Sequence, residues 1–97
     1  MASERRSVTY CRIEVAAERV GLPAARVRRY LRAGLVRPVA TEGRTPLLGE
    51  GELARLRRIR RLADDLGLNQ PGVEVALRLL DQIETLQAAL AERERRA

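Results

Sequence analysis

The sequence predicts a mostly α-helical fold, in which a helix-turn-helix is followed by a small β-hairpin, a further helix and a long C-terminal helix. Three observations predict it. Two short apolar patterns at helical spacing are separated by Gly21-Leu22-Pro23. A segment rich in strand and turn residues follows them, and a helical pattern then continues to the end of the chain. The 97 residues suffice for one small domain, or for a domain with a dimerising helix.

The first predicted helix covers residues 12–20. Ile13, Ala16, Ala17 and Val20 recur at helical spacing, and Gly21 follows directly after them. Glycine just past the last apolar position is a common end of a helix, because it adopts the left-handed conformation without strain.

The second predicted helix, residues 24–33, carries four arginines and ends at Gly34. Ala24, Val27 and Leu31 share one face. The remaining arc is basic and contains Arg26, Arg28, Arg29 and Arg32. The apolar side can therefore pack while the guanidinium groups bind an anion, and in a helix-turn-helix the second helix lies in the major groove of DNA. The alternative is a plain helical hairpin with a charged outer face.

Residues 35–48 are predicted to form a β-hairpin, or wing. Strand-forming and turn-forming residues surround the polar tip Glu42-Gly43-Arg44, with apolar pairs at both ends of the segment. Arg37 and Arg44 on this hairpin are candidate contacts to a neighbouring phosphate, or simply solvated arginines.

A further helix is predicted over residues 52–66, with one apolar stripe and arginines on its other faces. The stripe contains Leu53, Leu56, Ile59, Leu62, Ala63 and Leu66. Gly67 interrupts this helix, Asn69 is a suitable N-cap, and Pro71 is tolerated in a first turn, so the last helix is expected from about residue 71 to residue 95.

The last helix carries a second apolar pattern. Its residues step by four, three and four, as in a coiled-coil seam: Leu79, Ile83, Leu86 and Leu90. The seam favours a homodimer, with packing on the chain's own domain as the alternative. The expected organisation is a winged helix-turn-helix domain over residues 1–66 and a C-terminal helix for packing or dimerisation over residues 67–97.

The charge is unevenly distributed. The net charge is +6, and all 19 basic residues are arginine. Residues 1–61 contain 15 arginines and six carboxylates, a net charge of +9, whereas residues 62–97 contain four arginines and seven carboxylates, a net charge of −3. The basic part suits nucleic acid or an acidic protein, and the acidic part suits another partner or a second copy of the chain.

Several functions are not expected. The chain has no histidine and one cysteine, Cys11. We therefore expect no zinc site, no other metal site, no cofactor and no Cys/His nucleophile pair. Its carboxylates lie in helical patterns typical of solvated faces, and an enzyme is not expected. The sequence contains no apolar run of about 20 residues and no signal segment, which predicts a cytoplasmic protein without a membrane span.

Taken together, these elements resemble the MerR-type winged helix-turn-helix family. The matching residues lie in the first helix and turn, around the second helix, and after the wing: Val15-Ala16, Val20-Gly21-Leu22, Arg28, Tyr30, Gly34-Leu35, Pro38, Leu53, Arg55, Leu56 and Ile59. Residues 66–86 resemble the branch of this family that contains the heat-shock repressor HspR and the chaperone modulator CbpM, and Leu79-Leu80-Asp81-Gln82-Ile83 favours CbpM.

The resemblance implies two alternative functions. In the HspR-like alternative, which is slightly favoured, a dimer binds duplex DNA, with Arg28 and Tyr30 as backbone contacts. The candidate DNA-binding residues are then Arg26, Arg28, Arg29, Tyr30, Arg37 and Arg44. In the CbpM-like alternative, the chain binds the J-domain of a DnaJ-type co-chaperone through its acidic residues Asp64, Asp65, Glu74, Asp81 and Glu84.

One departure from the family pattern weakens the DNA-binding alternative. The resemblance implies an arginine and an aromatic residue on the returning strand of the wing, where this chain has Pro46 and Leu48. The chain also lacks the ligand cysteines of metal-sensing relatives and a separate effector domain, so we do not expect a small-molecule sensor.

Overall fold

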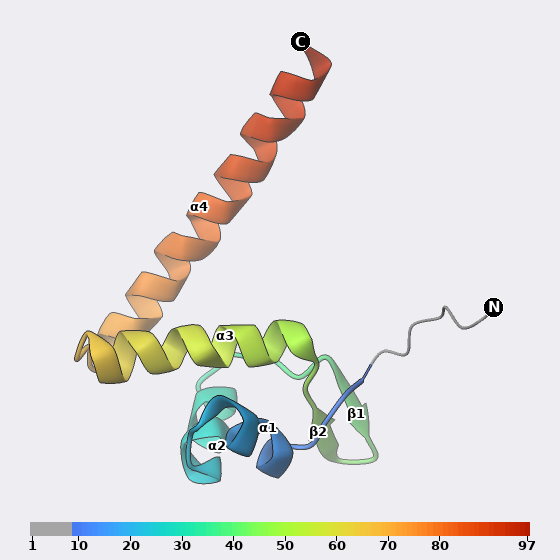
Figure 1. Cartoon of the computed structure of the whole chain (residues 1–97), viewed down its shortest axis with the longest axis vertical. Coiled ribbons are helices and arrows are strands. Elements are labelled where there is room, and N and C mark those ends of the chain that lie inside the picture. The colour runs from blue at the N-terminus through green and yellow to red at the C-terminus, as the bar shows by residue number, and fades with distance from the viewer. Residues whose placement is uncertain (1–8) are drawn as a thin grey trace, which may run out of the picture. The chain divides into compact units, whose positions relative to one another are not determined.

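The computed structural model describes residues 9–97, which form four α-helices, a short π-helical turn and a two-stranded hairpin (Figure 1). This is the mostly α-helical architecture that the sequence predicts. The chain divides between Arg60 and Arg61 into two compact units. The first unit contains the helix-turn-helix, the hairpin and α3, and the second contains the π turn and α4.

A three-residue turn connects α1 (Ile13–Val20) to α2 (Ala24–Arg32). Gly21 has φ 76°, and its backbone N–H donates to the Ala17 carbonyl over 2.9 Å. Only glycine adopts this left-handed conformation at little cost, so the chain leaves α1 here. Pro23 is the N-cap residue of α2, where its extended backbone needs no N–H donor.

The core of the first unit lies where α1 packs against both α2 and α3 (Figure 1). Buried side chains come from all three helices, from the turn between α1 and α2, from the segment after α2 and from the end of the hairpin. They are Ala16, Ala17, Val20, Leu22, Val27, Tyr30, Leu35, Val36, Leu48, Leu53, Leu56 and Ile59.

The wing is an antiparallel hairpin of β1 (Ala40–Glu42) and β2 (Thr45–Leu47), joined by the predicted turn. Directly after β2, Leu48 is fully buried and exchanges two backbone hydrogen bonds of 2.8 Å with Cys11. The family resemblance implies an aromatic residue near this position, but in this chain Leu48 completes the core.

Two arginines of α3 (Glu50–Arg60) attach this helix to the helix-turn-helix. Arg60 Nη1 donates to the Val20 carbonyl at the end of α1 over 3.0 Å, and Arg55 Nε donates to the Leu35 carbonyl just after α2 over 2.5 Å. Carbonyls at helix ends lack partners within the helix, so the first bond satisfies the Val20 carbonyl, and the two bonds together fix the position of α3.

The helix predicted over residues 52–66 is not one regular helix. It ends at Arg60 and continues as a π turn, η2 (Arg61–Asp65), in which the Leu66 N–H donates to the Arg61 carbonyl over 3.0 Å. A π turn contains more residues than an α turn, so it shifts the helical phase. As a result Leu66 does not lie on the buried stripe with Ile59, and 69% of its surface is exposed.

Asn69 caps α4 (Gln70–Arg96), as the sequence predicts: its Oδ1 accepts a 2.9 Å hydrogen bond from the Gly72 N–H. Val73 and Leu77 near the start of α4 are buried, and its later residues are mostly exposed. Within residues 9–97, no helix combines the length and the apolar character that crossing a bilayer requires.

Candidate nucleic-acid interface

The candidate DNA-binding residues of α2 lie in different surroundings. Arg28 and Arg29 are exposed, Arg26 is half-buried, and Tyr30 is buried. Arg28 Nη2 lies 2.6 Å from Glu14 Oε2 in an ion pair that joins α2 to the first turn of α1. Both side chains remain accessible, with 45% of Arg28 and 66% of Glu14 exposed, so a competing anion can approach the pair.

Tyr30 brings two of the predicted arginines together. Its hydroxyl accepts hydrogen bonds from Arg26 Nε over 3.1 Å and Arg26 Nη2 over 2.7 Å. The guanidinium carbons of Arg26 and Arg29 lie 5.6 and 5.4 Å from the centre of the Tyr30 ring. The three side chains therefore form one cationic cluster on the surface of α2.

The two candidates outside α2 lie on the wing side of the unit. Arg37 belongs to the segment between α2 and β1, and Arg44 belongs to the hairpin turn; both are exposed. In the same unit, Arg12 Nη2 and Glu42 Oε1 are 3.6 Å apart, an exposed pair that connects the chain before α1 to β1.

A second ion pair fixes the other side of α1. Arg19 Nη2 lies 2.9 Å from Glu50 Oε2 at the start of α3. The hydrogen bond and the negative charge of Glu50 raise the pKa of Arg19.

Glu14 was not predicted to be a partner of Arg28. The two residues are 14 positions apart on different helices, and no sequence pattern connects them. Only the packing of α1 against α2 brings their side chains into contact.

The candidate partner residues lie in the second unit. Asp64 and Asp65 are on η2 and are exposed. Glu74, Asp81 and Glu84 are separated by seven and three positions, so they share one face of α4.

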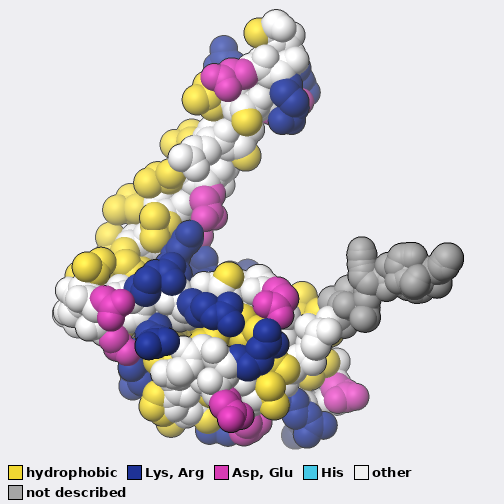
Figure 2. Space-filling view, viewed as in Figure 1, with side chains coloured by type: hydrophobic (Ala, Val, Ile, Leu, Met, Phe, Trp, Pro, Cys, Tyr) yellow, Lys and Arg dark blue, Asp and Glu magenta, His cyan; other side chains and the backbone are white. Residues whose placement is uncertain are grey.

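The predicted coiled-coil seam is an exposed apolar row along α4 (Figure 2). Leu79, Ile83, Leu86 and Leu90 expose between 48% and 69% of their surfaces. Val75 was not predicted to belong to this row, but it extends the row by one turn, with 50% of its surface exposed. Its spacing of four from Leu79 is a sequence signal for this position. We call Val75, Leu79, Ile83, Leu86 and Leu90 the α4 stripe.

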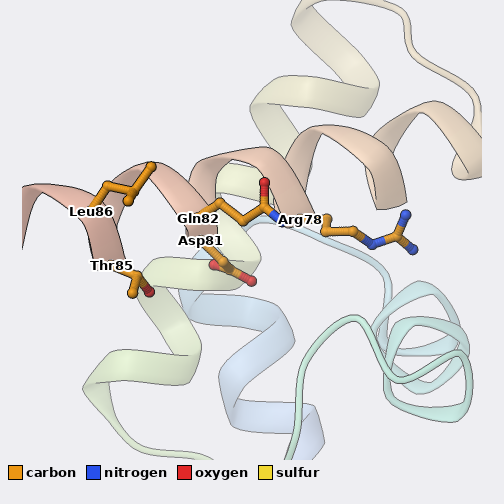
Figure 3. Close-up of a pocket in the computed structure, with 5 residues that line it drawn as sticks. All are labelled: Arg78, Asp81, Gln82, Thr85 and Leu86. Carbon is orange, nitrogen blue, oxygen red and sulfur yellow. The ribbon is translucent and has the colours of Figure 1, made fainter.

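An open hollow of about 430 Å³ lies beside this stripe (Figure 3). The five side chains that line it all project from α4: Arg78, Asp81, Gln82, Thr85 and Leu86. It is thus an open surface of one helix and not an enclosed ligand site. In residues 9–97, no group of three or more His, Cys, Asp or Glu side chains is arranged to hold a metal ion.

Comparison with known proteins identifies the family. The model of the MerR HTH family regulatory proteins matches residues 12–95, nearly the whole chain. The chain belongs to the MerR family. This family consists of helix-turn-helix regulatory proteins and is not an enzyme class.

A curated relative in Streptomyces coelicolor is described as a putative heat shock protein, HspR. It is 38% identical over 80 residues, which cover 82% of this chain and 53% of the relative. The chain therefore spans about half the length of that protein.

A solved structure shares the fold of this MerR-family chain. It is HiNmlR, a MerR family regulator that lacks the sensor domain and was crystallised with promoter DNA. The TM-score is 0.62, with 16% sequence identity, and the match covers 90% of this chain and 77% of the other. The predicted winged helix-turn-helix architecture is thereby confirmed.

Proposed function

We propose that this MerR-family chain is a transcription regulator of the heat-shock or chaperone system that binds duplex DNA as a homodimer. The contacts come from the arginines of α2 and the wing: Arg26, Arg28, Arg29, Arg37 and Arg44. The observation that carries the proposal is the accessible basic surface of α2, the helix that reads the major groove in a helix-turn-helix. The similarity to HspR supports the heat-shock assignment.

The proposal also assigns roles to the two parts of the chain. Residues 1–66 bind DNA, and residues 67–97 pair two copies through Leu79, Ile83, Leu86 and Leu90. A cytoplasmic location is part of this proposal, because a regulator of this kind acts on chromosomal DNA.

The test uses fluorescence anisotropy with a labelled duplex from upstream of the chain's own operon and with an unrelated duplex. The wild type is expected to prefer the upstream duplex at moderate salt. Arg28→Ala combined with Arg29→Ala should abolish this binding at moderate salt, since two of the four guanidinium groups of α2 are lost. The matched control is Arg93→Ala with Arg96→Ala, which removes the same charge from the end of α4 and should leave DNA binding intact.

A second candidate function rests on the acidic side chains of the second unit. Asp64, Asp65, Glu74, Asp81 and Glu84 present negative charge that complements a basic J-domain surface. We propose as the alternative that the chain modulates a DnaJ-type co-chaperone by binding its J-domain.

Charge reversal separates the two candidates. Asp81→Arg with Glu84→Arg should remove J-domain binding, measured by calorimetry with the encoded DnaJ-type protein, and should leave DNA binding intact. The Arg28/Arg29 variant should behave in the opposite way. Loss of both activities in a folded variant would contradict this division of roles.

A further inference from the structure

Tyr30 is buried on the helix that carries the basic surface. It exposes 2% of its surface, and it lies one turn after Arg26 on α2. Side chains four positions apart on a helix lie over one another, so the burial of Tyr30 places its hydroxyl beneath the guanidinium of Arg26.

The hydrogen bonds hold that guanidinium in one orientation. Arg26 Nε and Nη2 both donate to the Tyr30 oxygen, over 3.1 and 2.7 Å. A guanidinium is a rigid plane, and two donors on one acceptor fix the direction of that plane. The buried ring fixes the acceptor in turn, because a side chain with 2% exposure has few rotamers available.

The ring also contacts the second arginine of the cluster. The guanidinium carbon of Arg29 is 5.4 Å from the ring centre, within the range of a cation–π contact. This contact depends on the ring and not on the hydroxyl. Arg26 also lies over the ring, with its guanidinium carbon 5.6 Å from the centre, in addition to its two hydrogen bonds to the hydroxyl.

We infer that Tyr30 is a positioning residue, which sets the guanidinium of Arg26 before DNA arrives. The inference rests on the proposed function, in which Arg26 contacts a backbone phosphate. Tyr30 itself touches no phosphate in this role, unlike the backbone contact that the family resemblance implies for it. A side chain that is ordered before binding loses less conformational freedom on binding, which strengthens the complex.

The test replaces the hydroxyl alone. Tyr30→Phe keeps the ring and its contacts with both guanidinium groups but removes the oxygen that accepts from Arg26 Nε and Nη2. We expect DNA affinity to fall about three- to tenfold, because the ordering of one long side chain must then be supplied during binding. The slope of affinity against salt should stay as in the wild type, since every positive charge remains.

A double-mutant cycle distinguishes positioning from direct contact. In an Arg26→Ala background, Tyr30→Phe should cause no further loss, because its only route to DNA has been removed. The control is Tyr10→Phe, the same change at the other tyrosine of the chain, and it should leave affinity unchanged.

A readout without DNA tests the positioning by itself. The Arg26 Nε–H signal in a ¹⁵N NMR spectrum, assigned by its absence from Arg26→Lys, should exchange slowly with water in the wild type and rapidly in Tyr30→Phe. If Tyr30→Phe does not fold, Arg26→Lys carries the affinity test: it keeps the charge, cannot make the two-pronged bond, and should lose affinity to the same extent.

The outcomes separate this inference from the proposed function. Wild-type DNA binding with an unaffected Tyr30→Phe variant, or with additive losses in the cycle, overturns the positioning role and leaves the proposed function intact. A wild type that does not bind DNA overturns the proposed function and the inference with it, whatever the NMR signal shows.

Discussion

Two arginines of α2 are held by different chemistry in the free chain. Arg28 is paired with the carboxylate of Glu14, whereas Arg26 is bound to the neutral hydroxyl of Tyr30. A phosphate that approaches Arg28 meets the competing negative charge of Glu14, whereas the Tyr30 oxygen that orients Arg26 carries no charge. Glu14 is therefore expected to weaken DNA binding, and Tyr30 to strengthen it.

Replacing Glu14 tests the first half of this contrast. Glu14→Gln should raise the affinity for duplex DNA at low salt about two- to fivefold, because an exposed ion pair of this kind is worth about 0.2–1 kcal/mol. The measurement is the anisotropy titration, and the gain should shrink as salt is added.

Glu18→Gln is the matched control for this change. It removes the same charge one turn further along α1, where the side chain is also exposed. An equal gain from both substitutions would show that net charge alone is responsible and would contradict a specific role for the Glu14–Arg28 pair.

At the scale of the elements, the turn between α1 and α2 sets the direction of the basic helix. Gly21 has φ 76°, and a Cβ built on it would lie 3.0 Å from Arg60 Nη1. This guanidinium nitrogen donates to the Val20 carbonyl. The hydrogen bond that attaches α3 to α1 therefore lies directly beside the turn.

Gly21→Ala should lower the free energy of unfolding by about 1–2 kcal/mol, because alanine is strained in the left-handed conformation and displaces Arg60. Gly51→Ala is the control, since its Cβ would meet nothing within 4 Å and alanine favours the helix α3. Urea denaturation followed by circular dichroism measures both, and equal stabilities for the two variants would contradict this account of the turn.

The sequence predicted most of these elements because their signals are local. The glycine at the end of α1, the cap at Asn69 and the turn at Gly43 each act within a few residues, and the structure has all three. The π turn after Arg60 was not predicted, because an α pattern and a π pattern differ by one residue in a short segment.

The candidate site was only partly predictable, for a related reason. Helical spacing predicted the arginine face of α2. It did not predict the burial of Tyr30, because that depends on the tertiary packing of the first unit. Helical spacing also did not predict the pairing of Arg28 with Glu14, because this pair depends on the packing of α2 against α1.

At the scale of the whole molecule, the chain has a basic first part and an acidic second part with an exposed apolar row. The α4 stripe consists of five side chains, each at least 48% exposed, along one side of a 27-residue helix (Figure 2). Exposed apolar rows at this spacing are typical of helices that pair. Pairing would also present two α2 helices to one DNA site, and that raises the effective concentration of the second helix.

A charge placed within the stripe should disrupt this pairing. Ile83→Glu is expected to convert a dimer to a monomer in sedimentation equilibrium and to weaken DNA binding, because two like charges would meet at the interface. Ala88→Glu adds the same charge on the opposite, exposed face of α4 and should leave the dimer intact. A dimer that survives Ile83→Glu and not Ala88→Glu would assign the interface to the other face.

The central claim is that the α2 arginines bind the phosphates of duplex DNA, and the salt dependence of binding tests it most directly. If about half of the ten arginines proposed for a dimer each neutralise one phosphate, log affinity should fall with log salt at a slope of about −4 to −5. At salt concentrations low enough for residual binding, the Arg28/Arg29 variant should bind more weakly than the wild type, with a slope smaller in magnitude by about two to four. Binding with a slope that is unchanged in the variant, or with no salt dependence in the wild type, would contradict the claim.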